Sequence, residues 1–231
     1  MQHALGSPSG GATGTARRDL VIFDLDRTLL ADSSLATVAR VALRRRLLSP
    51  LKVLTGLVRN ARYARHGESG ALVAYARDAV LGAIEGRSVD ELLEVVDESI
   101  ERLLPRLRPT IAAALQQHLA RGERCIVLSA SPHELVDRLA RELGAERGIG
   151  TRGEIVDGRC TGRLDGPFCH GVGKIVRLRA ELGDVDLGHA LLYTDSSSDL
   201  PLLALVGERV VVDPDDELRA VAERQGWPIT S

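Results

Sequence analysis

The sequence has no long apolar run, no closely spaced cysteine pair and no large excess of either charge. No run approaches the roughly eighteen apolar residues that cross a bilayer, so we expect no membrane span. The 3 cysteines, Cys125, Cys160 and Cys169, are far apart and form no C-x-x-C pair, which indicates neither a zinc site nor a disulfide framework. A net charge of -2 gives no general attraction to nucleic acid, so we expect no nucleic-acid partner.

The first 18 residues are rich in Gly, Ser, Thr, Ala and Pro, and they have too few large apolar side chains to form a core. We therefore expect residues 1–18 to be a disordered tail. The pair Arg17-Arg18 is typical of twin-arginine export signals, but the apolar segment that follows is interrupted by Asp24 and Asp26. We expect no signal peptide and predict a cytoplasmic protein.

Short apolar segments alternate with helical patterns along the rest of the chain. Five of them are predicted strands, beginning near Leu20, Arg124, Ile149, Ala190 and Arg209. This alternation predicts an α/β fold with a doubly wound, parallel, five-stranded sheet and right-handed crossovers. Residues 154–162 carry a turn at Asp157-Gly158 and predict a surface hairpin.

Residues 31–108, between the first two predicted strands, show only helical patterns. We predict an all-helical cap inserted there, and an α/β core formed by residues 19–30 and 109–231. One helix of this cap is expected over residues 50–66, and another begins with a capping box over residues 88–91.

The charges of this insertion are separated along the chain. Residues 33–67 contain 8 Arg or Lys and no acid, whereas residues 85–101 carry mostly acids. The basic and acidic helices can neutralise each other, the basic residues can attract an anionic substrate, or a basic helix can lie on a membrane surface. The sequence leaves these three interpretations open.

Acidic side chains stand at the ends of two predicted strands. Asp24 and Asp26 follow the first strand, and Asp195 ends the fourth, with Asp199 one helical turn later. An isolated Asp-x-Asp pair is also typical of a strand-end cap, but neighbouring strands would bring all four carboxylates to the edge where α/β sheets bind ligands. Because close carboxylates repel by roughly 4 kcal/mol per pair at an effective dielectric of about 20, such a cluster needs a cation. All-oxygen ligands favour Mg²⁺.

Two further groups are placed to bind an anion. Ser129 ends the second predicted strand, and the small residues after it leave backbone N–H groups at a helix start, although Ser131 can equally be a plain helix cap. Lys174 lies in the first turn of a predicted helix, where the helix dipole disfavours a cation, so an anionic group is expected nearby. A carboxylate nucleophile, a metal and donors to oxygen together suit phosphoryl transfer.

Taken in order, these motifs resemble those of the haloacid-dehalogenase-like (HAD) superfamily, in its phosphoserine-phosphatase-like branch with a helical cap. The resemblance rests on residues 24–28, Ser129, Lys174 and residues 195–199, and it covers nearly all of the chain from about Asp19 onward. It implies a Rossmann-like core and a Mg²⁺-dependent phosphatase for a small phosphorylated metabolite.

The resemblance also implies a role for each acid. Asp24 would be the nucleophile that becomes an aspartyl phosphate, and Asp26 would protonate the leaving oxygen and then activate water. Mg²⁺ would be held by Asp24, by Asp26 through its backbone carbonyl, and by Asp195, with Asp199 assisting through water.

The resemblance also implies that the remaining residues of these motifs contact the substrate. Ser129, the amide of Ala130 and Lys174 would bind the phosphoryl oxygens, and Thr28 would contact the substrate within the first motif. The helical insertion would open and close over the site.

The chain departs from this branch in ways that limit the substrate prediction. Ser33 or Ser34 stands where phosphoserine phosphatases usually carry a Glu for the substrate's ammonium group, and Ser129-Ala130-Ser131 replaces their Ser-Gly-Gly. Phosphoserine is therefore not favoured. Arg27, where Gly is common, leaves the chemistry intact.

Two other functions remain open. A phosphotransferase would use the same intermediate with an acceptor other than water. A phospho-accepting receiver module also uses Asp, Ser or Thr, and Lys around Mg²⁺, but it needs neither the long helical insertion nor Asp26. Dehalogenation is disfavoured because that reaction has no use for a metal cluster.

Overall fold

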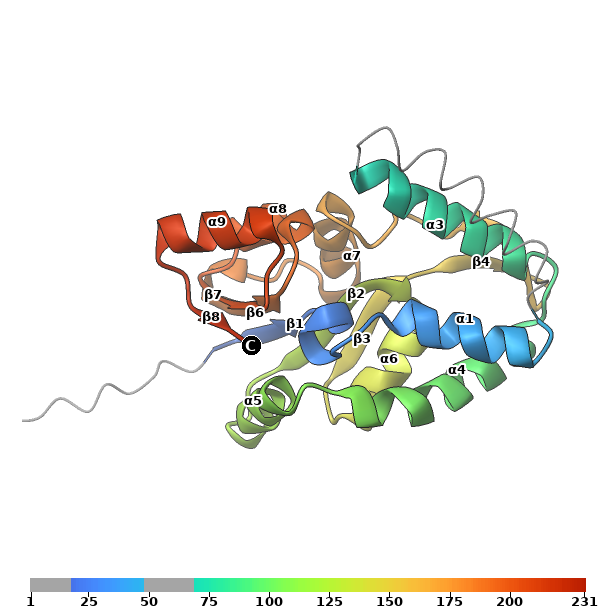
Figure 1. Cartoon of the computed structure of the whole chain (residues 1–231), viewed down its shortest axis with the longest axis horizontal. Coiled ribbons are helices and arrows are strands. Elements are labelled where there is room, and N and C mark those ends of the chain that lie inside the picture. Colours follow the sequence, from blue (N-terminus) through green and yellow to red (C-terminus); the bar gives the residue numbers. More distant parts are fainter. Residues whose placement is uncertain (1–17, 48–68) are drawn as a thin grey trace, which may run out of the picture.

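The computed structural model describes residues 18–47 and 69–231. The tail is predicted over residues 1–18, and its residues 1–17 lie outside the described residues, as does the helix predicted over residues 50–66. Arg18 is described, and its Nη2 lies 2.7 Å from Glu208 Oε2. Six strands form one parallel sheet in the order β3-β2-β1-β6-β7-β8 (Figure 1), and two more form an antiparallel hairpin. The strands are β1 (Leu20–Phe23), β2 (Cys125–Pro132), β3 (Arg147–Thr151), β4 (Gly153–Val156), β5 (Arg159–Leu164), β6 (Ala190–Thr194), β7 (Glu208–Val212) and β8 (Ile229–Thr230).

The helices of the described residues include α1 (Ser34–Arg44), α3 (Ser69–Ile84), α4 (Val89–Leu103), α5 (Pro109–Ala120), α6 (His133–Glu142), α7 (Val172–Leu182), α8 (Leu200–Leu203) and α9 (Asp216–Gln225). Helices α4, α5 and α6 pack on one face of the sheet, and α7, α8 and α9 pack on the other. Within the described ranges, none of them has both the length and the apolar character needed to span a bilayer. A cytoplasmic location stays a prediction.

Strand β1 lies near the middle of the sheet and is buried on both faces. Val21 and Phe23 pack with side chains of α4, α5 and α6, whereas Leu20 and Ile22 pack with those of α7, α8 and α9. A strand buried on both faces reads as a continuous apolar run rather than an alternating one, which explains its sequence. The α/β fold class with a doubly wound parallel sheet is therefore confirmed.

The predicted number of strands was wrong by one. β8 extends the sheet beyond β7, and Ile229 pairs with Val211. Val211 N donates to Pro228 O at 2.9 Å, and Asp213 N donates to Thr230 O at 2.8 Å. Two residues after a proline are too few to show a strand period, so this pairing becomes visible only when the chain end returns to β7.

The connection from β1 to β2 contains α1, α3 and α4. Helix α4 begins with the predicted capping box, in which Ser88 Oγ accepts from Glu91 N at 3.2 Å and Glu91 Oε2 accepts from Ser88 N at 3.0 Å. Arg45, just after α1, forms ion pairs with Glu94 and Glu98 of α4. These pairs support mutual neutralisation of basic and acidic helices at this point.

The hairpin β4–β5 is present as predicted, and its turn residues Asp157 and Gly158 have φ of 49° and 71°, which suits a tight hairpin turn. It joins the segment between α3 and α4, because Gly86 N donates to Cys160 O at 2.8 Å and Val89 N donates to Gly158 O at 3.0 Å. Strands from late in the chain therefore adjoin the helical insertion. The division into tail, core and cap stays a prediction.

Candidate active site

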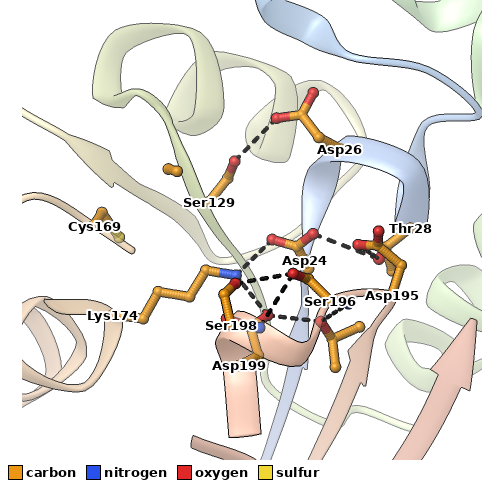
Figure 2. Close-up of polar contacts among 12 residues, drawn as sticks. Asp24, Asp26, Thr28, Ser129, Cys169, Lys174, Asp195, Ser196, Ser198 and Asp199 are labelled. Carbon is orange, nitrogen blue, oxygen red and sulfur yellow. Dashed lines mark hydrogen bonds and ion pairs between the residues drawn. The ribbon is translucent and has the colours of Figure 1, made fainter. Parts of the chain in front are cut away.

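The chain reverses direction immediately after β1. A wide helical turn over Leu25–Leu29 is closed by Leu29 N donating to Asp24 O at 3.3 Å, and Arg27 inside it adopts a left-handed conformation with φ of 61°. This reversal sends the two acids of the first motif in different directions. Figure 2 shows Asp24 beside Lys174 and Asp26 beside Ser129.

Lys174 lies between two buried carboxylates. Its Nζ donates to Asp24 Oδ1 at 2.7 Å and to Asp199 Oδ2 at 2.7 Å, and all three residues are buried. Thr194 Oγ1 donates to the same Asp199 oxygen at 2.6 Å. The prediction that an anionic group lies near Lys174 at the start of α7 is therefore confirmed.

Asp195 reaches the same place because β1 and β6 are neighbours, with Phe23 opposite Tyr193. Thr28 Oγ1 donates to Asp195 Oδ1 at 3.1 Å and lies 3.5 Å from Asp24 Oδ2. Arg27, largely exposed, places its Nε 3.0 Å from Asp195 Oδ2. The left-handed turn thus returns both Arg27 and Thr28 to the end of β6.

The Asp26 carboxylate lies apart from this cluster, which differs from the expected meeting of four carboxylates. Its Oδ2 accepts from Ser131 Oγ at 2.8 Å and from Ser129 Oγ at 3.4 Å, and its Oδ1 accepts from the backbone N–H of Ser34. Ser34 Oγ and Ser131 Oγ are also hydrogen-bonded at 2.8 Å. Asp26 is therefore positioned by the start of α1 and the end of β2, and only its backbone lies with Asp24.

The buried acids carry more negative charge than their neighbours neutralise. Burial raises the pKa of Asp24 to about 8, with Asp199 and Asp195 adding to the increase and Lys174 opposing it. Burial also raises the pKa of Asp195, against the opposing charge of Arg27. Burial by itself lowers the pKa of Lys174, but Asp199 and Asp24 outweigh it and raise that pKa. A further cation would stabilise this site.

The donor set fits a magnesium ion. Asp199 Oδ1 is buried and has no hydrogen-bond partner in the described part of the chain. Across residues 18–47 and 69–231, no three His, Cys, Asp or Glu side chains are already arranged around one metal position. Mg²⁺ does not require such a cluster, since it typically binds one or two carboxylates and keeps several waters. The carboxylates of Asp24 and Asp195, with the Asp26 carbonyl, are the groups that could hold it.

Ser129 and Ala130 lie at the end of β2, as the sequence predicted, although β2 continues to Pro132. Ser129 Oγ accepts from Ser131 N at 3.1 Å, and Ala130 O accepts from Thr151 Oγ1 at 2.7 Å. The first bond shapes the β2 end, and the second joins it to β3.

Three residues that orient the acids of this site are not predicted to do so from the sequence. The sequence predicts Arg27 as a minor variation and Ser131 as an optional helix cap, and its patterns do not single out Thr194. Thr194 carries the clearest retrospective signal, since a hydroxyl buried in an apolar strand requires a partner.

Cys169 lies near Lys174 in Figure 2 but is not a suitable nucleophile. Burial raises the pKa of its thiol to about 12, so the thiolate is scarce at neutral pH.

Comparison with known proteins supports the family resemblance that the sequence motifs indicate. The model of the family described as haloacid dehalogenase-like hydrolase matches residues 21–204. The chain is 36% identical over 211 residues to the phosphoserine phosphatase SerB1 of Mycobacterium tuberculosis, covering 90% of this chain and 68% of that protein. It is 32% identical to a histidinol-phosphatase of Neisseria meningitidis, over 92% of this chain and 98% of that protein.

A solved structure from Bordetella pertussis, described as a protein with unknown function, superimposes with a TM-score of 0.80 at 28% identity, covering 94% of this chain and 99% of that one. The family match spans the first motif, the β2 end, Lys174 and the second acidic motif together. The chain therefore belongs to the haloacid dehalogenase-like hydrolase family and is a phosphoric monoester hydrolase.

Proposed function

We propose that this phosphatase hydrolyses a small phosphate monoester through an aspartyl-phosphate intermediate on Asp24. The observation that carries the proposal is the separation of the two acids of the first motif. Asp24 is buried and paired with Lys174, whereas Asp26 is held by hydroxyl and amide donors from other elements. One carboxylate can then attack while the other transfers protons.

Asp24 is oriented for attack by its neighbours. Lys174 holds Oδ1 at 2.7 Å, and the 3.5 Å contact from Thr28 to Oδ2 is too long to be a strong hydrogen bond. Asp24 Oδ2 would form the bond to phosphorus as the bond to the leaving oxygen breaks. Lys174 Nζ and Ser129 Oγ would then donate to the phosphoryl oxygens, on which negative charge is spread.

Asp26 would act twice in the cycle. Protonated Asp26 would give its proton to the leaving oxygen, which departs as the alcohol. The resulting carboxylate would take a proton from the water that attacks the aspartyl phosphate and releases inorganic phosphate. Ser131 and the Ser34 backbone N–H fix its orientation in both steps.

Members of this family generally use Mg²⁺, and the site of this chain has the groups to bind it. Asp24, Asp195 and the backbone carbonyl of Asp26 would hold the ion, with Asp199 assisting through water. When bound, Mg²⁺ neutralises charge on the phosphoryl oxygens and on the acids themselves. The buried Asp199 Oδ1, which has no hydrogen-bond partner among the described residues, supports this assignment.

We further propose that residues 31–108 form a cap that opens and closes over a core of residues 19–30 and 109–231, and that the enzyme acts in the cytoplasm.

The substrate is proposed to be a small phosphorylated metabolite. The names of the relatives do not identify it, because one is called a phosphoserine phosphatase and another a histidinol-phosphatase. Ser34 is engaged with Asp26 and offers no carboxylate for an ammonium group, so phosphoserine is not favoured.

The nucleophile is tested by comparing Asp24→Asn with Asp19→Asn, because both acids flank β1 and Asp19 is exposed. Phosphate release from acetyl phosphate and ethyl phosphate is measured with Mg²⁺ and again with excess EDTA. We expect Asp24→Asn to lose roughly 10³-fold or more of the rate, Asp19→Asn to retain it, and EDTA to abolish it.

Near-normal hydrolysis by Asp24→Asn would contradict the proposed nucleophile, and an unchanged rate in EDTA would contradict the metal. Added alcohol acceptors separate the alternative of phosphoryl transfer. A phosphorylated alcohol formed in place of inorganic phosphate would identify a phosphotransferase.

A further inference from the structure

A cavity of about 510 Å³ opens beside the acid that is proposed to protonate the leaving oxygen. Asp26, Ala130 and Ser131 belong to its lining. A phosphoryl group at Asp24 would therefore place the alcohol part of the ester past Asp26 and into this cavity. Its volume lies within the roughly 300–1,000 Å³ typical of small-molecule sites, and a three-carbon substrate would leave much of it unfilled.

The helices of the insertion supply a hydrocarbon wall to this cavity. Apolar atoms make up most of its exposed lining. The aliphatic side chains that α1, α3 and α4 contribute include Leu35, Val38, Leu81, Ile84, Leu92 and Leu93. Phe168, in the loop before α7, adds an aromatic ring.

The few charged groups of the lining are mostly engaged elsewhere. Among the described residues they are Asp26, Arg27, Arg77 and Glu134. Arg27 pairs with Asp195, and Arg77 lies 5.4 Å from the centre of the Phe168 ring and bonds to Asp78. A zwitterionic alcohol would lose hydration in this mostly apolar cavity, where the polar groups that the described lining offers in place of water are few.

We propose that the substrate of this enzyme is a phosphate monoester of an apolar alcohol, with an alkyl or aryl group that fills the cavity between Asp26 and helices α1, α3 and α4. This inference rests on the proposed function. It adds that recognition comes from burial of hydrocarbon rather than from pairing with a charged substrate group.

The test compares a homologous series of substrates on the full chain with Mg²⁺. Ethyl, butyl, hexyl and octyl phosphate are compared with 6-aminohexyl phosphate, which matches hexyl phosphate in length but carries an ammonium group. Acetyl phosphate reports the chemistry at Asp24 independently of the cavity. We expect kcat/KM to rise by roughly fourfold per methylene until the cavity is filled, and 6-aminohexyl phosphate to fall at least about tenfold below hexyl phosphate.

Variants of the wall test the same point. Leu92→Asn should lower kcat/KM for hexyl phosphate by roughly tenfold or more, and by more than it lowers that for acetyl phosphate, because Leu92 contributes hydrocarbon to the wall of the cavity. Leu205→Asn is the matched control, since Leu205 is 40% exposed and lies outside this cavity. Leu93→Trp should shift the preferred chain length to a shorter alcohol, which a change in folding alone would not do.

The possible results distinguish failure of the apolar substrate class from failure of the proposed function. If acetyl phosphate is hydrolysed but the alkyl series is flat, or if 6-aminohexyl phosphate is preferred to hexyl phosphate, the apolar substrate class is wrong while the proposed function stands. If no compound, acetyl phosphate included, is hydrolysed, the proposed function fails and this inference fails with it.

Discussion

At the scale of single residues, the direction of one carboxylate determines how the site can work. Asp24 and Asp26 are two positions apart, yet Lys174 bonds to the first, and Ser131 and Ser34 bond to the second. The left-handed Arg27 in the turn after them makes this divergence possible. A non-glycine residue held at such a φ stores of order 1–3 kcal/mol of backbone strain, and its ion pair with Asp195 helps to offset that cost.

Asp26→Asn should slow turnover of ethyl phosphate by about 10²- to 10⁴-fold, because the amide can neither protonate the leaving oxygen nor activate water. Acetate leaves without a proton, so phosphorylation by acetyl phosphate should persist and the phospho-enzyme should accumulate. Intact-protein mass spectrometry after mixing with acetyl phosphate would detect the added phosphoryl group. Asp32→Asn, at a largely exposed acid paired with Arg106, serves as the control. A normal rate with ethyl phosphate in Asp26→Asn would refute the assigned role.

At the scale of elements, β3 and α6 pack backbone against backbone next to the β2 end. A Cβ at Gly148 would lie 2.2 Å from Val136 O, so neither element has room for a methyl group there. Asp137 Oδ1 also accepts from Gly148 N at 2.9 Å, which ties the helix to the strand. Ser129, Ala130 and Ser131 depend on this contact for their position, because β2 pairs with β3.

Gly148→Ala should therefore lower the free energy of unfolding by about 1–3 kcal/mol. Gly153→Ala is the matched control, because Gly153 also lies in a strand and a Cβ there meets nothing within 4 Å. Urea denaturation of both variants gives the comparison. Equal stability of the two would show that β3 and α6 can separate without cost.

A second element-scale feature joins α5 to β6 and β2. His118 Nδ1 donates to Glu123 Oε2, and Tyr193 Oη lies 3.0 Å from His118 Nε2, with all three side chains buried. Burial raises the pKa of Glu123, but the hydrogen bond from His118 and the charge of Arg18 outweigh it and hold that pKa below its ordinary value. The ionised form of Glu123 is thus favoured in the folded state.

The lowered pKa of Glu123 predicts that the stability of the folded protein depends on pH. Ionised Glu123 contributes to the free energy of unfolding. This contribution is fully present above the ordinary pKa of a Glu side chain, and it is lost as the pH falls through the lowered pKa of Glu123 in the folded state. We expect Glu123→Gln to be less stable than the parent at pH 7, by about 1–3 kcal/mol, and to lose less stability on acidification to pH 3. Thermal unfolding from pH 7 to pH 3 measures both, with the exposed Glu142→Gln as control. A parallel pH profile for Glu123→Gln and the parent would contradict the lowered pKa.

At the scale of the whole molecule, binding at the site should stabilise the fold. Asp24 and Asp195 come together only in the folded chain, since they lie 171 positions apart in the sequence. An ion that binds the folded state alone adds about 2.7 kcal/mol at a hundredfold excess over its dissociation constant. For a protein of this size, that corresponds to a rise of roughly 5–10 °C in Tm.

Mg²⁺ should produce this rise in the parent protein and in Asp184→Asn, whose acid is exposed and remote from the site. Asp195→Asn should lose most of the shift. Thermal scans with Mg²⁺ and with EDTA make the measurement without any substrate. An undiminished shift in Asp195→Asn would place the ion elsewhere.

The fold class, the family and the order of the chemical groups can all be predicted from the amino-acid sequence. Strand ends are marked by where an apolar run stops, so Asp24, Ser129 and Asp195 could be assigned to one edge of a parallel sheet from local patterns alone. The capping box of α4 and the β4–β5 turn were equally readable, because each depends on residues within four positions of one another.

How those groups face one another depends on the three-dimensional packing of the chain. It placed Lys174 between Asp24 and Asp199, turned Asp26 toward Ser131, and added β8 to the sheet. It also joined three helices into a cavity beside Asp26. Each of these depends on side-chain direction and on contacts between distant segments, which a one-dimensional pattern of apolar and polar residues does not encode.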